Sequence, residues 1–210
     1  MAHKKRRGAE IPTSSMADIA FLLLIFFLVT TTIATDRGLT LQLPPKPDPN
    51  EPPPDITKNK RNIFKILVNS QDRLLVEDEP VTDVDQIKDQ VKEFILNYGR
   101  PNEGALAVYN SLPPKLRQIS KGSVESSDHP EEAVVSFKAD RGTSYEMYLA
   151  VLDQLQGAYY EIYAERAGVS TEKFRNLDRK KPEERDLYDL AREGMPMNIS
   201  IAEPTKIGGN

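Results

Sequence analysis

The chain has 210 residues, a formal net charge of -4 and 29% charged residues, which indicates one soluble domain joined to a further segment. So small a net charge gives no electrostatic case for nucleic-acid binding. The sequence has no Cys, which excludes disulfides, thiolate metal sites, a Cys nucleophile and a lipid anchor on Cys.

The N-terminal part of the chain predicts a membrane-spanning helix. Residues 1–15 contain the basic cluster KKRR. Residues 16–35 follow as an apolar run, and Asp18 is its one charged residue. As a helix, the stretch from Met16 to Ala34 would measure roughly 28 Å, close to the hydrocarbon thickness of a bilayer. By the positive-inside rule, the N-terminus stays cytoplasmic and residues 36–210 are exported.

A cleaved signal peptide is the alternative interpretation of this segment. A basic region precedes the apolar core IAFLLLIFFLV, and the small residues Thr32 and Ala34 are spaced like a cleavage site. An acid such as Asp18 is unusual in a signal peptide, and helix-compatible residues continue through Ala34. A retained anchor is therefore favoured.

Residues 36–61 predict an extended spacer. Seven of the eleven residues from Pro44 to Pro54 are proline, which excludes a helix or a central strand. Such a segment favours polyproline II geometry and would extend on the order of 35 Å. It would hold the soluble domain, residues 62–203, away from the membrane.

The soluble domain begins with two predicted strands. The runs NIFKILVN and RLLVEDEPV are joined by the polar turn SQD and predict a hairpin, with the acidic residues 76–80 at a solvated end. A helix follows, for which we expect Thr82 as N-cap and Gly99 as the stop. Residues 100–130 are rich in Pro, Ser, Asn and Gly and predict an irregular insertion.

The second half of the domain predicts a strand, a long helix, a short helix and a last strand. AVVSFKAD reads as a buried strand, and TSYE after it matches a capping box with Thr143 as N-cap. Apolar residues at helical spacing then favour a core face over a ligand platform (Tyr148, Leu152, Leu155, Tyr159 and Ile162). A polar stretch, 168–181, precedes a short helix between Pro182 and Gly194, and MPMNISIAE is the last strand before a tail at 204–210.

The predicted fold is therefore a single N-terminal transmembrane helix followed by a small α+β domain. The order β-β-α-β-α-β, with helical and loop insertions, places one sheet against helices.

Asp18 is the candidate functional residue of the apolar segment, and two interpretations are open. It could be a helix N-cap at the membrane surface, stabilised by the helix dipole, although Ser14 and Ser15 could cap instead. It could also be a proton carrier, because a carboxylic acid inside a helix bundle can bind and release a proton near neutral pH. An inserted carboxylate costs roughly 2.5–3.5 kcal/mol, so an idle one is disfavoured. A single span would need a membrane partner to build a proton path.

Few other residues suggest chemistry. Thr30, Thr31 and Thr32 are candidates for lining a pore, although such threonines most often bond back to their own helix. The two histidines, His3 and His129, are far apart in the sequence, and no phosphate loop, metal cluster or nucleophile–base pair stands out. We therefore predict no enzyme activity, no cofactor and no metal.

Taken together, these features resemble the ExbD/TolR family of bacterial energy transducers. The family has one transmembrane helix with a single Asp near its cytoplasmic end, which falls on Asp18. Its Leu-Pro just past the membrane matches Leu43-Pro44, a candidate linker and partner motif. The hairpin with its closing Pro80-Val81 is similar to the first strands of the family. VSFKADRGTSYEMYLAVLDQLQ resembles its strand–Ala-Asp–helix signature.

This resemblance implies a single-pass subunit of the bacterial inner membrane with a periplasmic domain. A polytopic ExbB/TolQ-like protein would form a ring around a homodimer of this chain's helix, and protons would pass through Asp18. In the ExbD branch, the soluble domain acts on a TonB-like protein that energises outer-membrane transport. In the TolR branch, it serves envelope integrity.

The sequence leaves the branch open, together with a third interpretation. A membrane-tethered anchor could bind peptidoglycan or another protein without energy coupling. The chain also departs from the family pattern: many relatives have Pro where it has Ser15, and residues 100–130 and 163–195 look like insertions. These departures leave the partner-binding surfaces unassigned.

Overall fold

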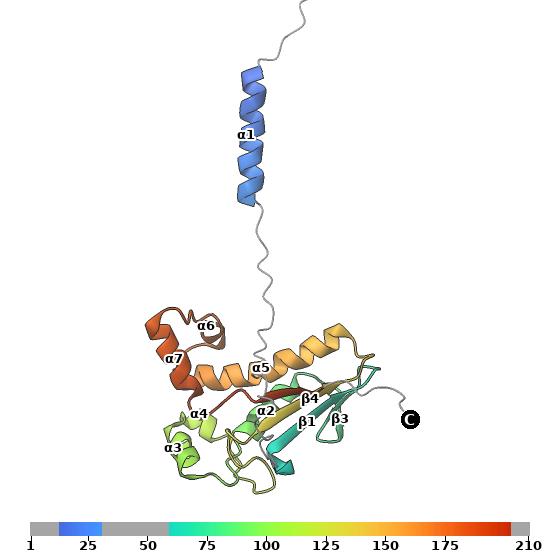
Figure 1. Ribbon diagram of the computed structural model, residues 1–210, viewed down its shortest axis with the longest axis vertical. Coiled ribbons are helices and arrows are strands. Elements are labelled where there is room, and N and C mark those ends of the chain that lie inside the picture. The colour runs from blue at the N-terminus through green and yellow to red at the C-terminus, as the bar shows by residue number, and fades with distance from the viewer. Residues whose placement is uncertain (1–12, 31–58, 203–210) are drawn as a thin grey trace, which may run out of the picture. The chain divides into compact units, whose positions relative to one another are not determined.

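A computed structural model describes residues 13–30 and 59–202 of the chain (Figure 1). At the two ends of the first range, residues 13–15 and 28–30, the description covers the backbone alone. The chain divides into two compact units, residues 1–54 and 55–210. Most of the predicted spacer and the predicted tail lie outside the described residues.

The first unit contains one helix, α1 (Thr13–Thr30). Its large apolar side chains between Met16 and Phe27 are between 41% and 65% exposed. Every residue from Phe21 to Phe27 is one of them. A helix that is apolar on all sides has no polar face to turn toward water. Among the residues that the structure describes, no helix reaches the length and apolar character that crossing a bilayer requires.

The second unit is built on a mixed five-stranded sheet with the order β3-β2-β1-β4-β5. At its centre, β1 (Ile63–Val68) pairs antiparallel with β2 (Leu74–Val76) and parallel with β4 (Val134–Ala139). The edges are β3 (Glu79–Val81), antiparallel to β2, and β5 (Ile199–Ala202), parallel to β4. The α+β class is therefore confirmed.

Two helices, α2 (Gln86–Ile95) and α5 (Tyr145–Ala167), cover one face of this sheet. Phe64 of β1 packs against Phe94 of α2, with ring centroids 5.1 Å apart. On β4, which shares this face in parallel register, Phe137 packs against Tyr148 of α5 at 5.3 Å. The other stripe residues of α5 are at most 1% exposed (Leu152, Leu155, Tyr159 and Ile162). The stripe belongs to the core, as expected.

The run RLLVEDEPV forms two strands, so the prediction of a single strand is wrong. Glu77 and Asp78 turn between β2 and β3 with φ angles of 50° and 68°. Positive φ at both central residues is typical of a tight hairpin turn that matches the twist of the strands. Of residues 76–80, which were expected at a solvated end, residues 77–80 are exposed, whereas Val76 is buried.

Two predicted helix caps are also wrong. Thr82 lies in a turn, and α2 begins only at Gln86 because Asp83 first accepts a hydrogen bond from the Asp85 amide. Before α5, the cap is Ser144, whose hydroxyl accepts from the Met147 amide at 3.1 Å. Thr143 instead donates its hydroxyl to the Asn69 carbonyl at 3.1 Å, which ties the start of α5 to the end of β1.

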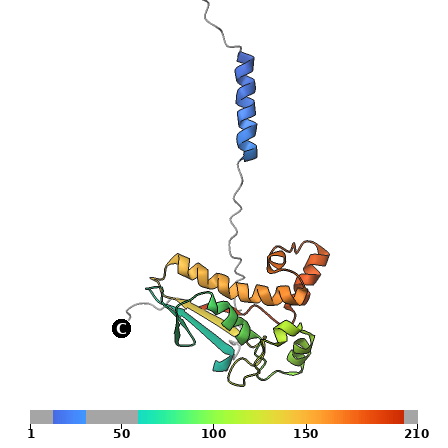
Figure 2. The same cartoon turned by 180° about the vertical axis from the view of Figure 1, so that it is seen from behind.

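The described segments that were expected to be irregular or polar contain three helices. Residues 100–130 include α3 (Glu103–Ser111) and α4 (Pro114–Arg117). The polar stretch before Pro182 includes α6 (Thr171–Arg175). The predicted helix α7 (Pro182–Arg192) begins at its proline, and Gly194 follows with a positive φ. Figures 1 and 2 show α6 and α7 at the C-terminal end of α5.

A long loop, residues 118–133, is held by the buried side chain of Asn97. Its Nδ2 donates to the carbonyls of Ser123 and Ser127, each at 2.7 Å, and its Oδ1 accepts from the Ser123 amide. Gly99 lies beside this loop, and a Cβ there would come within 2.1 Å of the Ser123 carbonyl oxygen. Gly99 is therefore required by close packing, whereas α2 itself already ends at Ile95.

The same loop is tied to the start of β1 by an ion pair. Arg61 donates from Nε and Nη2 to the two carboxylate oxygens of Asp128, each at 2.8 Å. Asn62 donates to the same carboxylate at 2.9 Å. These hydrogen bonds hold the pKa of Asp128 below its usual value, and the bond from Arg61 contributes most to this shift.

We predict that Asp128→Ala destabilises the second unit by on the order of 2 kcal/mol. This is less than for a fully buried pair, because the Arg61 side chain keeps 25% of its exposure. The lowered pKa means that the pair stabilises the fold at neutral pH and that this contribution is lost as the pH falls through the folded-state pKa. Urea unfolding near pH 7 and pH 3, followed by circular dichroism, measures both effects.

Asp128→Asn should accordingly lose less stability on acidification than the wild type. The matched control is Asp189→Asn, since Asp189 is exposed on α7. If the wild type and Asp128→Asn lose stability equally between the two pH values, the pair does not contribute as described.

Candidate functional site

The helix α1 places Asp18 in its second turn. The helix begins at Thr13, and its first turn contains no acid. An N-cap residue directly precedes the first helical residue and accepts hydrogen bonds from the first amides, whereas Asp18 comes five residues after Thr13. Of the two interpretations, the helix start therefore contradicts the N-cap.

Asp18 shares its side of the helix with apolar side chains. Residues three and four positions further along a helix are neighbours, and these are Phe21 and Leu22, each 59% exposed. From Met16 to Phe27, the part of α1 whose side chains are described, Asp18 is the single ionisable residue. No cation of this stretch can neutralise it, so a lone carboxylate stands in an apolar surface.

The remaining predicted site residues are less fully described. Thr30 is the last residue of α1, and its side chain lies outside the description. Thr31, Thr32, Leu43 and Pro44 lie outside the described residues altogether. Their roles in a pore and in a linker motif stay predictions.

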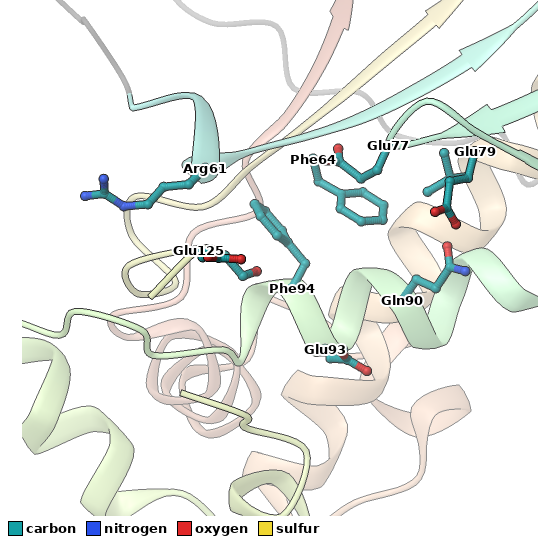
Figure 3. A pocket seen from close by; sticks show the side chains of 10 residues that line it. Arg61, Phe64, Glu77, Glu79, Gln90, Glu93, Phe94 and Glu125 are labelled. Carbon is teal, nitrogen blue, oxygen red and sulfur yellow. The ribbon is translucent and has the colours of Figure 1, made fainter. Parts of the chain in front are cut away.

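The second unit contains a groove between the β2–β3 hairpin and α2, with a volume of about 330 Å³ (Figure 3). Its apolar floor is formed by Phe64, Val76 and Phe94, which are between 4% and 7% exposed. Four glutamates from three segments, the hairpin, α2 and the long loop, line it as well (Glu77, Glu79, Glu93 and Glu125). We call this feature the acidic groove.

The charges of the acidic groove are only partly compensated. Glu93 pairs with Lys121 at 2.5 Å, and Glu77 accepts from the Lys65 amide at 2.5 Å. Within the described part of the chain, the carboxylates of Glu79 and Glu125 make neither an ion pair nor a hydrogen bond. Arg61 also lines the groove, but its guanidinium is bound to Asp128.

One polar atom in the acidic groove lacks a partner. Gln90 of α2 lines the groove, and its Oε1 is buried without a hydrogen bond from any residue that the structure describes. A buried acceptor without a donor lowers stability, because it has lost its bond to water. A ligand with an N–H group would relieve this cost.

The described residues hold no group of three or more His, Asp or Glu side chains that could bind a metal ion. His129, the one histidine among them, is buried, and its Nε2 lies 3.4 Å from the side-chain amide of Asn102. It belongs to the long loop, faces the N-cap residue of α3 and is not among the residues that line the acidic groove.

Comparison with known protein families resolves the identity of the chain. The model of a family described as biopolymer transport protein ExbD/TolR matches residues 4–165, more than half of the sequence. The chain belongs to the ExbD/TolR family. This confirms the resemblance, and the family's description gives transport rather than catalysis as its role. A comparison with curated proteins finds no match.

The extent of the ExbD/TolR match bears on the expected insertions. It includes Asp18, the acidic groove and residues 100–130, and it ends within the last turn of α5. The helices α6 and α7 and the edge strand β5 therefore lie beyond the matched part. Residues 163–195, expected to be an insertion, fall almost entirely outside it.

Sequence reasoning did not find the acidic groove. In the sequence, Phe64 belongs to a predicted strand and Phe94 to a predicted helix, whereas Glu79 falls in the acidic run 76–80 and Glu125 in the segment 100–130. One signal in the sequence could have indicated the groove. Gln90 is a polar residue one turn before Phe94, on the side of α2 that packs on the sheet.

We predict that Gln90→Met raises the stability of the second unit by about 1 kcal/mol. Met has a similar length and removes the buried acceptor that has no partner. Thermal and urea unfolding of the full chain in detergent should both show the increase. Gln86→Met, at the exposed start of α2, is the control and should change stability little. A loss of stability in Gln90→Met would mean that Oε1 is satisfied in solution.

Proposed function

We propose that the chain is an energy-transducing subunit of the bacterial inner membrane in which Asp18 carries protons. The observation that carries the proposal is the place of Asp18 in the second turn of α1, among exposed apolar side chains. Membership of a biopolymer transport family supports it. A carboxylate that is not a cap and has no cation beside it is costly unless it titrates.

Residues 16–35 would span the membrane once, with the N-terminus in the cytoplasm and the second unit in the periplasm. The apolar character of α1 on all sides supports burial in lipid or among other helices. The basic cluster before the helix supports the orientation.

A lone acid on one helix requires partners. We propose that an ExbB/TolQ-like ring surrounds two copies of α1 and encloses Asp18, with Thr30, Thr31 and Thr32 toward the same pore. The second unit would then act on a TonB-like protein that drives outer-membrane transport, as in the ExbD branch. Leu43-Pro44 would stand where the chain leaves the membrane.

The energy available to such a device is sufficient. One charge that moves through 100 mV releases about 2.3 kcal/mol, and one pH unit adds about 1.4 kcal/mol. Inverting the populations of a two-state element requires about 5.5 kcal/mol. Two protons per cycle therefore meet the requirement under these conditions.

We predict that Asp18→Asn accumulates normally and loses energy-dependent activity by more than about tenfold. Asn keeps the shape of the side chain but cannot titrate. Asp18→Glu keeps the charge but displaces it, so partial activity is expected. Complementation of a deletion strain, scored for outer-membrane uptake and for detergent sensitivity, measures the effect and separates the ExbD role from the TolR role.

Asp189→Asn on α7 is the control for this test and should complement fully. Protein levels are compared by immunoblot so that a folding defect is recognised. Full complementation by Asp18→Asn would contradict proton coupling and favour a static anchor that binds peptidoglycan or another protein.

We predict opposite labelling of cysteines placed on the two sides of the membrane. The chain has no native Cys, so Glu10→Cys and Tyr145→Cys each carry one thiol. In intact spheroplasts, a membrane-impermeant maleimide should label position 145, which is 75% exposed, and should label position 10 only after permeabilisation. A mature N-terminus near Thr35 would instead identify a cleaved signal peptide.

A further inference from the structure

We propose that the acidic groove binds an extended cationic segment of a partner protein, which places one apolar side chain on the groove floor that Phe64 and Phe94 form together. This inference goes beyond the proposed function and is independent of whether Asp18 carries protons.

The charge of the acidic groove selects a cationic ligand. The two cations near it, Arg61 and Lys121, are already paired with Asp128 and Glu93. The carboxylates of Glu79 and Glu125 remain available on opposite sides, one from the hairpin and one from the long loop. A groove with uncompensated charge of one sign attracts segments of the opposite sign and disfavours anionic ligands.

The floor of the acidic groove adds an apolar contact at its centre. Phe64 and Phe94 are tilted toward each other, and Figure 3 shows their rings between the acidic side chains of the rim. A volume of about 330 Å³ accommodates a large side chain with adjoining backbone, and it is at the low end for small-molecule sites. Gln90 lines the groove, and rotation of its side chain would bring the buried Oε1 to a backbone N–H of the bound segment.

The edge of the sheet beside the groove cannot accept the segment as an added strand. The edge strand β3 has only three residues, and its middle residue is Pro80, which has no N–H. Addition of a strand requires a row of backbone donors and acceptors. Recognition must therefore use the side chains of the rim and floor, which makes binding sensitive to glutamate substitution.

The test uses a fluorescent twelve-residue peptide in which lysines alternate with glycines around a central leucine. Binding to the full chain in non-ionic detergent is measured by fluorescence anisotropy, with empty micelles as the blank. We expect saturable binding at low salt that weakens as NaCl rises to about 300 mM. A peptide with glutamate in place of lysine should not bind, and replacing the leucine by glycine should weaken binding about tenfold.

The double variant Glu79→Gln/Glu125→Gln should weaken binding about fivefold, the change expected for the loss of two exposed ion pairs. The matched control, Asp186→Asn/Asp189→Asn, makes the same change in net charge on α7 and should bind like the wild type. Circular dichroism confirms that both variants are folded.

Three results would overturn the proposal. These are no binding of the lysine peptide to the wild type, equal binding by the glutamate double variant, and an equal loss in the α7 control, which would indicate attraction by net charge alone. Gln90→Met gives a further check, because removal of the acceptor should weaken binding even though the variant is folded.

Discussion

Burial of one face of β1 is the constraint on which the second unit depends. Phe64, Ile66 and Val68 alternate along the central strand and are at most 7% exposed, so this face must be covered. The helices α2 and α5 pack on this face, and β2 and β4 pair with the two edges of β1. Arg61 and Asn62, just before the strand, bind Asp128 and thereby fix the long loop. The acidic groove arises where this loop, the hairpin and α2 meet above Phe64.

The two units divide the proposed work between them. In α1, a single acid stands in an apolar surface, so any charge change there is concentrated at one point, Asp18. In the second unit, the ionisable residues are numerous, and several of them form ion pairs that join separate elements. An example is Glu161 of α5, which binds Lys88 and Lys92 of α2 at 2.7 Å each and joins the two helices. Under the proposed function, the first unit would carry the proton and the second unit would contact the partner protein.

Much of the fold could be predicted from sequence because its main elements carry strong local patterns. The alternation in β1, the apolar run of β4 and the stripe of α5 each repeat over several turns or residues. The misses have physical reasons. β3 was missed because Glu77 and Asp78 adopt positive φ without glycine. Before α5, two adjacent hydroxyls compete for the cap, and the contact of Thr143 with the distant Asn69 decides it. The acidic groove joins residues far apart in sequence, which no local pattern reports.

The parallel pairing of β4 and β5 has a consequence for the architecture of this chain. Parallel neighbours need a crossover of about a dozen residues or more, and α5 with its 23 residues is long enough to provide one. Lengthening a connection costs little entropy, so α6 and α7 fit between α5 and β5 without disturbing the sheet. The family match ends at residue 165, before β5. A protein shortened to that boundary would expose the backbone groups of β4 along its whole outer edge. Residues 199–202 therefore replace a six-residue edge strand by one of four residues, and a shorter edge is less prone to pair with another chain.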